Sequence, residues 1–297
     1  MVSQRVHHDD LIGHLLEIDP NGWTVVEIPA IAEEDRDYII GEDEYYFRKA
    51  GEPLHAQLES LEILENIKTS VGSFVFQSQY QQNPMPPGGV LFKNDWFPRY
   101  KKTPFLKSFD RIVESWDTAS SIGSDAAYSA CTTWGERGNK RTLLCCQRHR
   151  LEFPDLLRVI QSSARAHWAH AILIENKSSG QQAIQSLRGK NLNIIPIQPV
   201  GDKESRALQA SAIIEAGRVE IPQEAPWLPE YLDELLKFPH CKYKDQVDST
   251  VQYLLWAEKT TPKFDVRMTR LSSDGCKEVY KDNYFSRNGR GVFDDFF

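Results

Sequence analysis

A short, largely apolar run that ends on an acid limits the folds open to this chain. Residues Ile112–Trp116 lead directly into Asp117, and small residues follow. Residues 171–174 lead in the same way into Glu175. An acid at the end of a buried strand lies at the sheet edge where open α/β sheets bind ligands. We therefore expect an α/β protein whose strand ends bring acidic side chains together.

A third acidic segment opens a helical pattern near residue 245. Asp245 and Asp248 are three residues apart and share one helix face, and apolar Val247, Val251 and Leu254 indicate that this helix packs on the domain. Acids that converge from three separate elements repel one another unless divalent cations lie between them, and Mg²⁺ or Mn²⁺ prefers oxygen ligands. The sequence therefore predicts a metal site.

The predicted ligands are Asp117, Glu175 and Asp248, with Asp245 as an auxiliary ligand. Two such ions about 4 Å apart would suit phosphodiester hydrolysis. Taken singly, each acid also has a simpler explanation. Asp117 would cap a turn, Glu175 would pair with Lys177, and the two helical acids would be favoured by the helix dipole. The metal hypothesis depends on all of them meeting at one point.

Basic residues stand at two predicted helix starts. Lys203 and Arg206 follow a strand end, where a cation gains nothing from the helix dipole, so phosphate contact is one explanation and a solvated helix start is the other. Lys177 is a weaker candidate of the same kind. The sequence contains no G-x-x-x-x-G-K-[ST] phosphate loop, which excludes ATP hydrolysis by that route within this chain.

The net charge of -7 is unevenly distributed. Residues 1–90 hold 5 basic and 16 acidic side chains, a balance of -11, which leaves 30 and 26, or +4, for residues 91–297. The second part is therefore compatible with a polyanionic substrate.

Five cysteines without C-x-x-C spacing are predicted to be free thiols, so a metal would bind through oxygen. No apolar run approaches the roughly 18 residues that a membrane span needs, and a cytoplasmic protein is expected.

The order of predicted elements suggests a mixed sheet with helices on both faces. Three strands joined by short turns, at 110–115, 128–134 and 141–148, should form an antiparallel meander. Further strands are expected at 171–175, 192–197 and 219–221, and helices at 154–168, 178–189, 204–216, 227–237 and 245–258, with Ser178 or Ser179 as a helix cap. The acidic first part has helical patterns at 9–17 and 56–68 and a strand at 23–28. The Pro/Gly cluster 84–89 marks a boundary.

The motifs resemble the RNase H-like nuclease domain of phage terminase large subunits, the DNA-packaging motor proteins. The matching segments are 115–119 with Asp125 following, 174–180, 201–207, 217–222 and 245–248. Residues 5–14 resemble the late ATPase motif of these proteins, and 79–84 their interdomain link. The resemblance implies a C-terminal remnant of an ATPase domain at 1–89, a nuclease domain at 90–260 and a polar tail at 261–297, without the nucleotide-binding portion.

The resemblance also implies an activity, which is Mg²⁺- or Mn²⁺-dependent cleavage of double-stranded DNA during packaging in the cytoplasm of a bacterial host. Its metal ligands fall on Asp117, Glu175 and Asp248, and Lys203, Arg206 and Lys177 would contact DNA. The expected partners are DNA, a small terminase subunit, a portal protein and a separate ATPase portion.

One departure from the family pattern keeps a second function open. The third motif reads Tyr243-Lys-Asp245 where a His-Asp-Asp triplet is common, so a His and one Asp are absent and Lys244 brings positive charge near a cation site. The alternative is a non-catalytic assembly module or remnant that needs an ATPase partner. A Holliday-junction resolvase or recombinase of the same fold would use similar acids, but the match at residues 79–84 counts against it.

Overall fold

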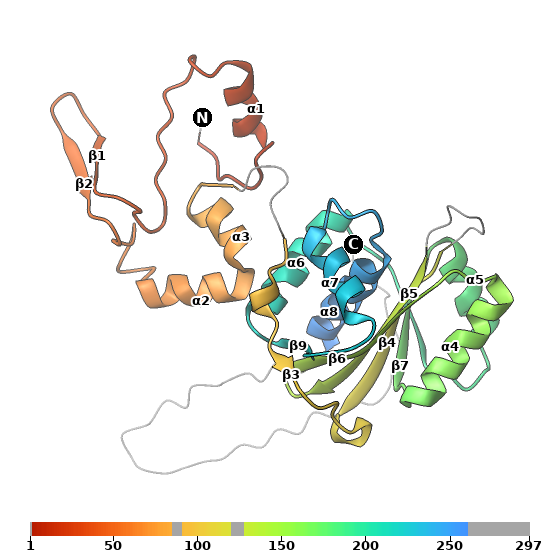
Figure 1. Ribbon diagram of the computed structural model, residues 1–297. Helices are drawn as coiled ribbons and strands as arrows, with labels where there is room; N and C mark the ends of the chain where they lie inside the picture. Colours follow the sequence, from red (N-terminus) through yellow and green to blue (C-terminus); the bar gives the residue numbers. More distant parts are fainter. Residues whose placement is uncertain (1, 85–90, 120–127, 261–297) are drawn as a thin grey trace, which may run out of the picture. The chain divides into compact units, whose positions relative to one another are not determined.

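A seven-stranded mixed sheet organises the larger part of the protein. The computed structural model describes residues 2–84, 91–119 and 128–260 (Figure 1). The strand order is β3-β9-β6-β5-β4-β7-β8. The strands are β3 (Arg99–Tyr100), β4 (Arg111–Asp117), β5 (Ser129–Arg137), β6 (Lys140–His149), β7 (Ala171–Glu175), β8 (Ile194–Ile197) and β9 (Val219–Pro222). The fold is α/β with a mixed sheet flanked by helices, as predicted from the sequence.

The direction of the strands follows from the length of their connections. β4, β5 and β6 pair antiparallel, which confirms the predicted meander. β7 lies parallel to β4 on one side and to β8 on the other, and β9 lies parallel to β6 and to β3. Parallel neighbours need crossover connections, and helices supply them. β4 and β7 therefore end at the same edge of the sheet.

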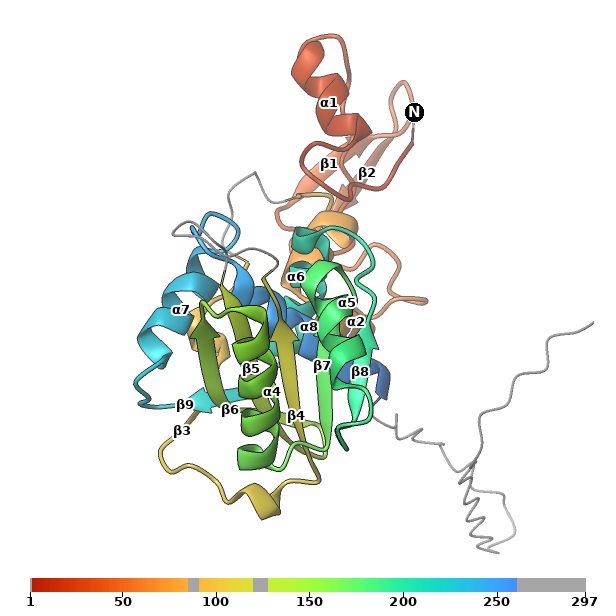
Figure 2. The same ribbon diagram turned by 90° about the vertical axis from the view of Figure 1, so that its right-hand side faces the viewer.

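Helices cover both faces of the sheet (Figure 2). α4 (Phe153–His167) and α5 (Ser178–Leu187) pack on one face through a core that includes Trp116, Ile160, Ile172 and Ile174. α6 (Lys203–Glu215), α7 (Leu228–Lys237) and α8 (Asp245–Thr260) pack on the other face. The central strands β4, β5 and β7 therefore have two buried faces, and successive side chains of one strand enter different cores.

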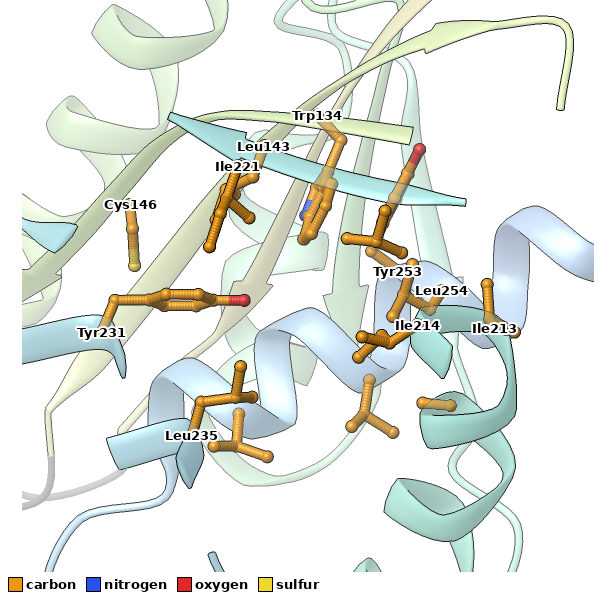
Figure 3. Packing of buried hydrophobic residues seen from close by; sticks show 14 of the residues in the cluster. Trp134, Leu143, Cys146, Ile213, Ile214, Ile221, Tyr231, Leu235, Tyr253 and Leu254 are labelled. Carbon is orange, nitrogen blue, oxygen red and sulfur yellow. The ribbon is translucent and has the colours of Figure 1, made fainter. Parts of the chain in front are cut away.

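The larger core lies between the sheet and α6 to α8. The rings of Trp134 on β5 and Tyr253 on α8 stack with centroids 4.6 Å apart (Figure 3). Val247, Val251 and Leu254 of α8 are buried in this core, as their spacing predicted. Because α8 packs through three consecutive turns, its first turn is held at a fixed position relative to the sheet.

A buried carboxylate lies on the opposite face of β4. Glu114 is 0% exposed, and it accepts hydrogen bonds from Ser163 Oγ (2.6 Å), His167 Nδ1 (2.9 Å) and Trp116 Nε1 (3.2 Å). Hydrogen bonds with Cys145 and Glu114 raise the pKa of His167 to about 9, against burial that lowers it. A protonated His167 therefore balances the charge of Glu114 beneath α4.

The first part of the chain contains small elements around a minor core. These are α1 (Leu11–Ile18), the antiparallel strands β1 (Arg36–Ile39) and β2 (Tyr45–Arg48), α2 (Leu61–Val71), α3 (Ser73–Val75) and a π-helical turn at Phe76–Tyr80. The minor core contains Ala30, Leu64 and Phe76. The backbone N–H of Ser73 donates to Glu215 of α6 (2.8 Å).

Two sequence expectations about elements were wrong, and one strand was missed. Residues 23–28 form no strand, because their large apolar side chains stay exposed and no described strand pairs with them, whereas the acidic segment that follows forms β1 and β2. The two-residue strand β3 was not expected, since so short a strand has no periodicity. Neither Ser178 nor Ser179 caps α5, because Lys177 is the N-cap and the Ser179 hydroxyl donates to the carbonyl of Thr118.

The remaining expectations concern the cysteines, membrane spans and domain boundaries. The described cysteines are free thiols, as predicted, with Cys131 and Cys146 buried and Cys145 and Cys241 half-buried. No helix in the described ranges is long and apolar enough to cross a membrane. The division into 1–89, 90–260 and 261–297, and the ATPase origin of the first segment, stay predictions. The tail 261–297 and most of the cluster 84–89 lie outside the described residues.

Candidate metal centre

The alternation of β4 and β7 brings Asp117 and Glu175 to the same face of the sheet. Trp116 pairs with Ile174 in the parallel register, so the next residues, Asp117 and Glu175, are neighbours at the ends of their strands. Neighbouring strands are about 4.8 Å apart. Trp116 and Ile174 both point into the α4 and α5 core, and their successors therefore point towards α8.

Polar side chains fix the first turn of α8 against the end of β4. Ser115 Oγ donates to the carbonyl of Ser249 (2.7 Å), and Ser249 Oγ bonds the carbonyl of Ser115 (2.7 Å). Thr132 of β5 donates its backbone N–H to Ser249 Oγ (3.1 Å), and Gln252 Nε2 donates to Ser115 Oγ (2.9 Å). All four residues are buried. Asp248, one residue before Ser249, is thereby held beside Asp117.

A glycine allows α5 to begin directly above the end of β7. A Cβ atom on Gly180 would lie 2.0 Å from the carbonyl oxygen of Glu175 and 3.2 Å from Thr118 Oγ1. Only glycine fits so close to the backbone at this position. The close approach places Ser179 where its hydroxyl bonds the Thr118 carbonyl (2.8 Å), which ties the segment after β7 to the segment after β4.

The four acids Asp117, Glu175, Asp245 and Asp248, here called the acidic centre, interact electrostatically. Burial raises the pKa of Asp117 well above its usual range, and the charges of Asp248, Asp245 and Glu175 raise it further, while Lys203 opposes the rise. Burial also raises the pKa of Asp245, with Asp248 adding to the effect. Burial also raises the pKa of Asp248, although its hydrogen bond to Lys203 opposes the rise. Charged carboxylates are thus unfavourable here without a cation.

Two basic side chains from α6 supply positive charge to Asp248. Asp248 is 5% exposed, and its carboxylate accepts a hydrogen bond from Lys203 Nζ and lies 3.9 Å from Arg206 Nη2. Arg206 is only 8% exposed, which leaves little of its side chain for an external ligand. Lys203 has half of its side chain in solvent, and exposed Lys177 lies 3.4 Å from Glu175. Pairing with an acid and contact with an external phosphate are therefore both geometrically open to these two lysines.

The donor set of the acidic centre fits a hard divalent cation. Its members are all carboxylates, they converge from β4, β7 and α8, and their mutual repulsion requires a counter-charge. Among the described residues, however, no three His, Cys, Asp or Glu side chains already stand at metal-binding spacing. The ammonium of Lys203 bonds Asp248 instead. A bound ion would thus require Lys203 to leave Asp248 and the carboxylates to rotate inward.

Sequence reasoning missed the residues that position these acids. Ser115, Thr132, Ser249 and Gln252 are polar residues at buried positions, and this is the signal that would have indicated them, because buried polar groups need partners. Asp125, which follows the first motif, lies outside the described residues.

Comparison with known proteins agrees with this architecture. Residues 114–256 match the family model described as the terminase RNaseH-like domain. The large terminase from a thermophilic bacteriophage superposes in its crystal form 2 with a TM-score of 0.52 and 10% identity, covering 66% of this chain and 51% of that chain. Crystal form 3 of the same large terminase gives 0.50 and 10%, covering 66% and 52%. At such identity the likeness shows the fold alone.

A third solved structure superposes on a smaller part of this chain. The large terminase nuclease from thermophilic phage G20c with bound cobalt gives a TM-score of 0.46 and 14% identity, covering 57% of this chain and 98% of that chain. The chain spans about half the length of the large terminase chains seen in crystal forms 2 and 3. No curated protein matches it.

Proposed function

We propose that the chain, whose residues 114–256 match the family model of the terminase RNaseH-like domain, is a metal-dependent endonuclease that cleaves double-stranded DNA during phage genome packaging. The observation that supports this most is the convergence of Asp117, Glu175 and Asp248 at one edge of the sheet. The acids come from three elements separated widely in sequence. A purely structural role would not require several carboxylates to share one partly buried site.

The proposed ligands of the metal are Asp117, Glu175 and Asp248, with Asp245 as an auxiliary ligand. Mg²⁺ or Mn²⁺ held there, as two ions, would activate the attacking water and stabilise the leaving oxygen of a phosphodiester. The protein supplies orientation: the bonds of Ser115 to Ser249 fix α8, and Gly180 fixes the start of α5. Asp248 is buried, whereas Asp117, Glu175 and Asp245 are partly exposed.

The basic residues receive different roles in this proposal. Lys203 and Lys177 are exposed enough to contact the DNA backbone, which gives salt-dependent binding with little sequence preference. Arg206 was predicted to bind DNA from the sequence alone. Since it is buried behind Asp248, we assign it to positioning that carboxylate.

A plasmid-nicking assay tests the activity. The full chain should nick supercoiled DNA with Mn²⁺ or Mg²⁺ and lose this activity in EDTA. Asp117→Asn should reduce cleavage by at least about 100-fold while circular dichroism stays unchanged, because Asn removes the central charge without a change of shape. Asp155→Asn on α4, an exposed acid paired with Arg158, is the matched control and should cut normally. Full activity in Asp117→Asn would refute the proposal.

A second function is favoured by two specific observations. The Lys203 ammonium bonds Asp248, and the motif before Asp245 contains Tyr243 and Lys244 in place of further metal-type ligands. A non-catalytic assembly module of a packaging motor would tolerate both features. Wild-type protein that binds DNA but fails to nick it with either metal would favour this alternative.

The proposal also includes binding partners and a place of action in the cell. The partners are double-stranded DNA, a small terminase subunit, a portal protein and a separate ATPase portion, and the place of action is the cytoplasm of a bacterial host. Co-purification of the full chain with each of the three candidate proteins would test the assembly directly.

A further inference from the structure

Five side chains form an aromatic and basic ledge beside the acidic centre. The ledge consists of Tyr128, Arg148, Arg150, Lys242 and Tyr243. The rings of Tyr128 and Tyr243 meet edge to face with centroids 5.0 Å apart. The proposed catalysis gives these residues no role, and only Tyr243 belongs to one of the sequence motifs.

The two tyrosine rings hold the cations in place. The guanidinium carbons of Arg148 and Arg150 lie 4.1 Å and 4.2 Å from the centroid of the Tyr128 ring. Arg150 Nη2 donates a hydrogen bond to Tyr243 Oη (3.2 Å), and Lys242 Nζ lies 5.1 Å from the Tyr243 ring. Contacts of this kind orient a cation without neutralising it.

The charge of the ledge is only partly balanced. Arg148 is paired with Glu230 and with Glu234 (3.5 Å) of α7. Arg150 and Lys242 are exposed, and no carboxylate of the described residues lies within 4.0 Å of either one. Two oriented positive charges are therefore available to an external anion.

Strand register gives the position of the ledge relative to the acidic centre. Asp117 pairs with Ala130, and Ala130 pairs with Arg148, so Asp117 and Arg148 lie on strands two steps apart, a distance of about 10 Å. Burial raises the pKa of Asp245, and the backbone of Tyr128 opposes that rise, so the ledge adjoins the acidic centre.

We propose that the ledge is a phosphate-binding subsite that holds the backbone of the DNA strand next to the phosphate at the acidic centre. This inference rests on the proposed function, because it takes the acidic centre as the place of cleavage. Arg150 and Lys242 bind phosphate oxygens, while Tyr128 and Tyr243 keep the cations extended towards them. Preorganised cations lose less conformational entropy on binding.

Fluorescence anisotropy with a labelled DNA duplex tests the subsite independently of cleavage. The measurements use the full chain in EDTA over a range of NaCl concentrations. The double variant Arg150→Ala, Lys242→Ala should weaken the Kd by at least about tenfold near 0.1 M salt and reduce the salt slope of log K by about 2, since each phosphate contact contributes about 0.9. Tyr243→Leu should weaken the Kd less, with a smaller change of slope, because both cations remain.

Arg165→Ala is the matched control, since Arg165 is exposed on α4 on the opposite face of the sheet. It should leave the Kd and the slope unchanged. The subsite is overturned if the double variant keeps the wild-type Kd and slope, if Arg165→Ala weakens binding equally, or if the wild-type chain does not bind DNA and the ledge therefore serves another partner. Ledge-dependent binding without nicking would contradict the proposed nuclease and leave the subsite supported.

Discussion

Replacement of His167 should make the stability of the protein less dependent on pH. Hydrogen bonds with Cys145 and Glu114 raise the pKa of His167 from 6.5 to about 9 in the folded protein. A group whose folded pKa is raised stabilises the fold fully below the unfolded pKa, and this contribution is lost as the pH rises through the folded pKa. A shift of that size corresponds to about 3 kcal/mol of folding free energy.

Urea unfolding of wild-type protein and of His167→Gln, measured from pH 6 to pH 10, provides the test. The difference in the free energy of unfolding between them should fall by up to about 3 kcal/mol across this range, with most of the change between pH 7 and pH 9. His240→Gln is the control, since His240 is exposed and should leave the profile unchanged. Cys145→Ala should reduce the span without abolishing it, because the bond to Glu114 remains.

Parallel pH profiles of wild-type protein and His167→Gln would refute this reasoning. That outcome would mean that His167 stays neutral beside Glu114 and that the buried carboxylate is satisfied by Ser163 and Trp116 alone.

Three further predictions concern the acidic centre. Asp117→Asn should raise the free energy of unfolding in EDTA at pH 7.5 by about 1 kcal/mol. The reason is that the folded pKa of Asp117 is raised, so its charged form destabilises the fold as the pH rises. In thermal melts, Mg²⁺ should stabilise the wild-type protein but not the variant. Lys203→Ala should lower the free energy of unfolding in EDTA by about 1 kcal/mol or less, because half of the Lys203 side chain is exposed. An equal loss in saturating Mg²⁺ would contradict the role of Lys203 as the counter-charge of Asp248. Gly180→Ala should lower the free energy of unfolding in urea by about 2 kcal/mol, because the added Cβ would collide with the Glu175 carbonyl. An unchanged urea midpoint would show that α5 can shift to accommodate the methyl group.

The sequence was informative wherever apolar periodicity was long. The meander and β7 followed from runs of buried residues, and α8 followed from Val247, Val251 and Leu254, whose spacing matches the face that packs. Residues 23–28 had a strand-like composition, but no neighbouring edge pairs with them in the described residues, and composition alone cannot supply a partner.

The candidate site was predictable in its acids and not in its surroundings. Asp117 and Glu175 could be placed at one sheet edge because each ends a buried strand. The contact of Ser115 with Ser249 and the contact of Lys203 with Asp248 join residues distant in sequence, and single polar residues have no period that would pair them. The assignment of the acids as metal ligands stays a prediction for the nicking assay.

The way α8 is fixed has a consequence for the synthesis of the protein. Ser115 finds its partner Ser249 only after 134 further residues have been made. While the ribosome is still translating the middle of the message, β4 has no hydrogen-bonding partner from α8 and the carboxylate of Asp248 does not yet exist. Formation of such distant contacts is slow and comes late in folding. Under the proposed function, we therefore expect nascent and prematurely terminated chains to lack nuclease activity.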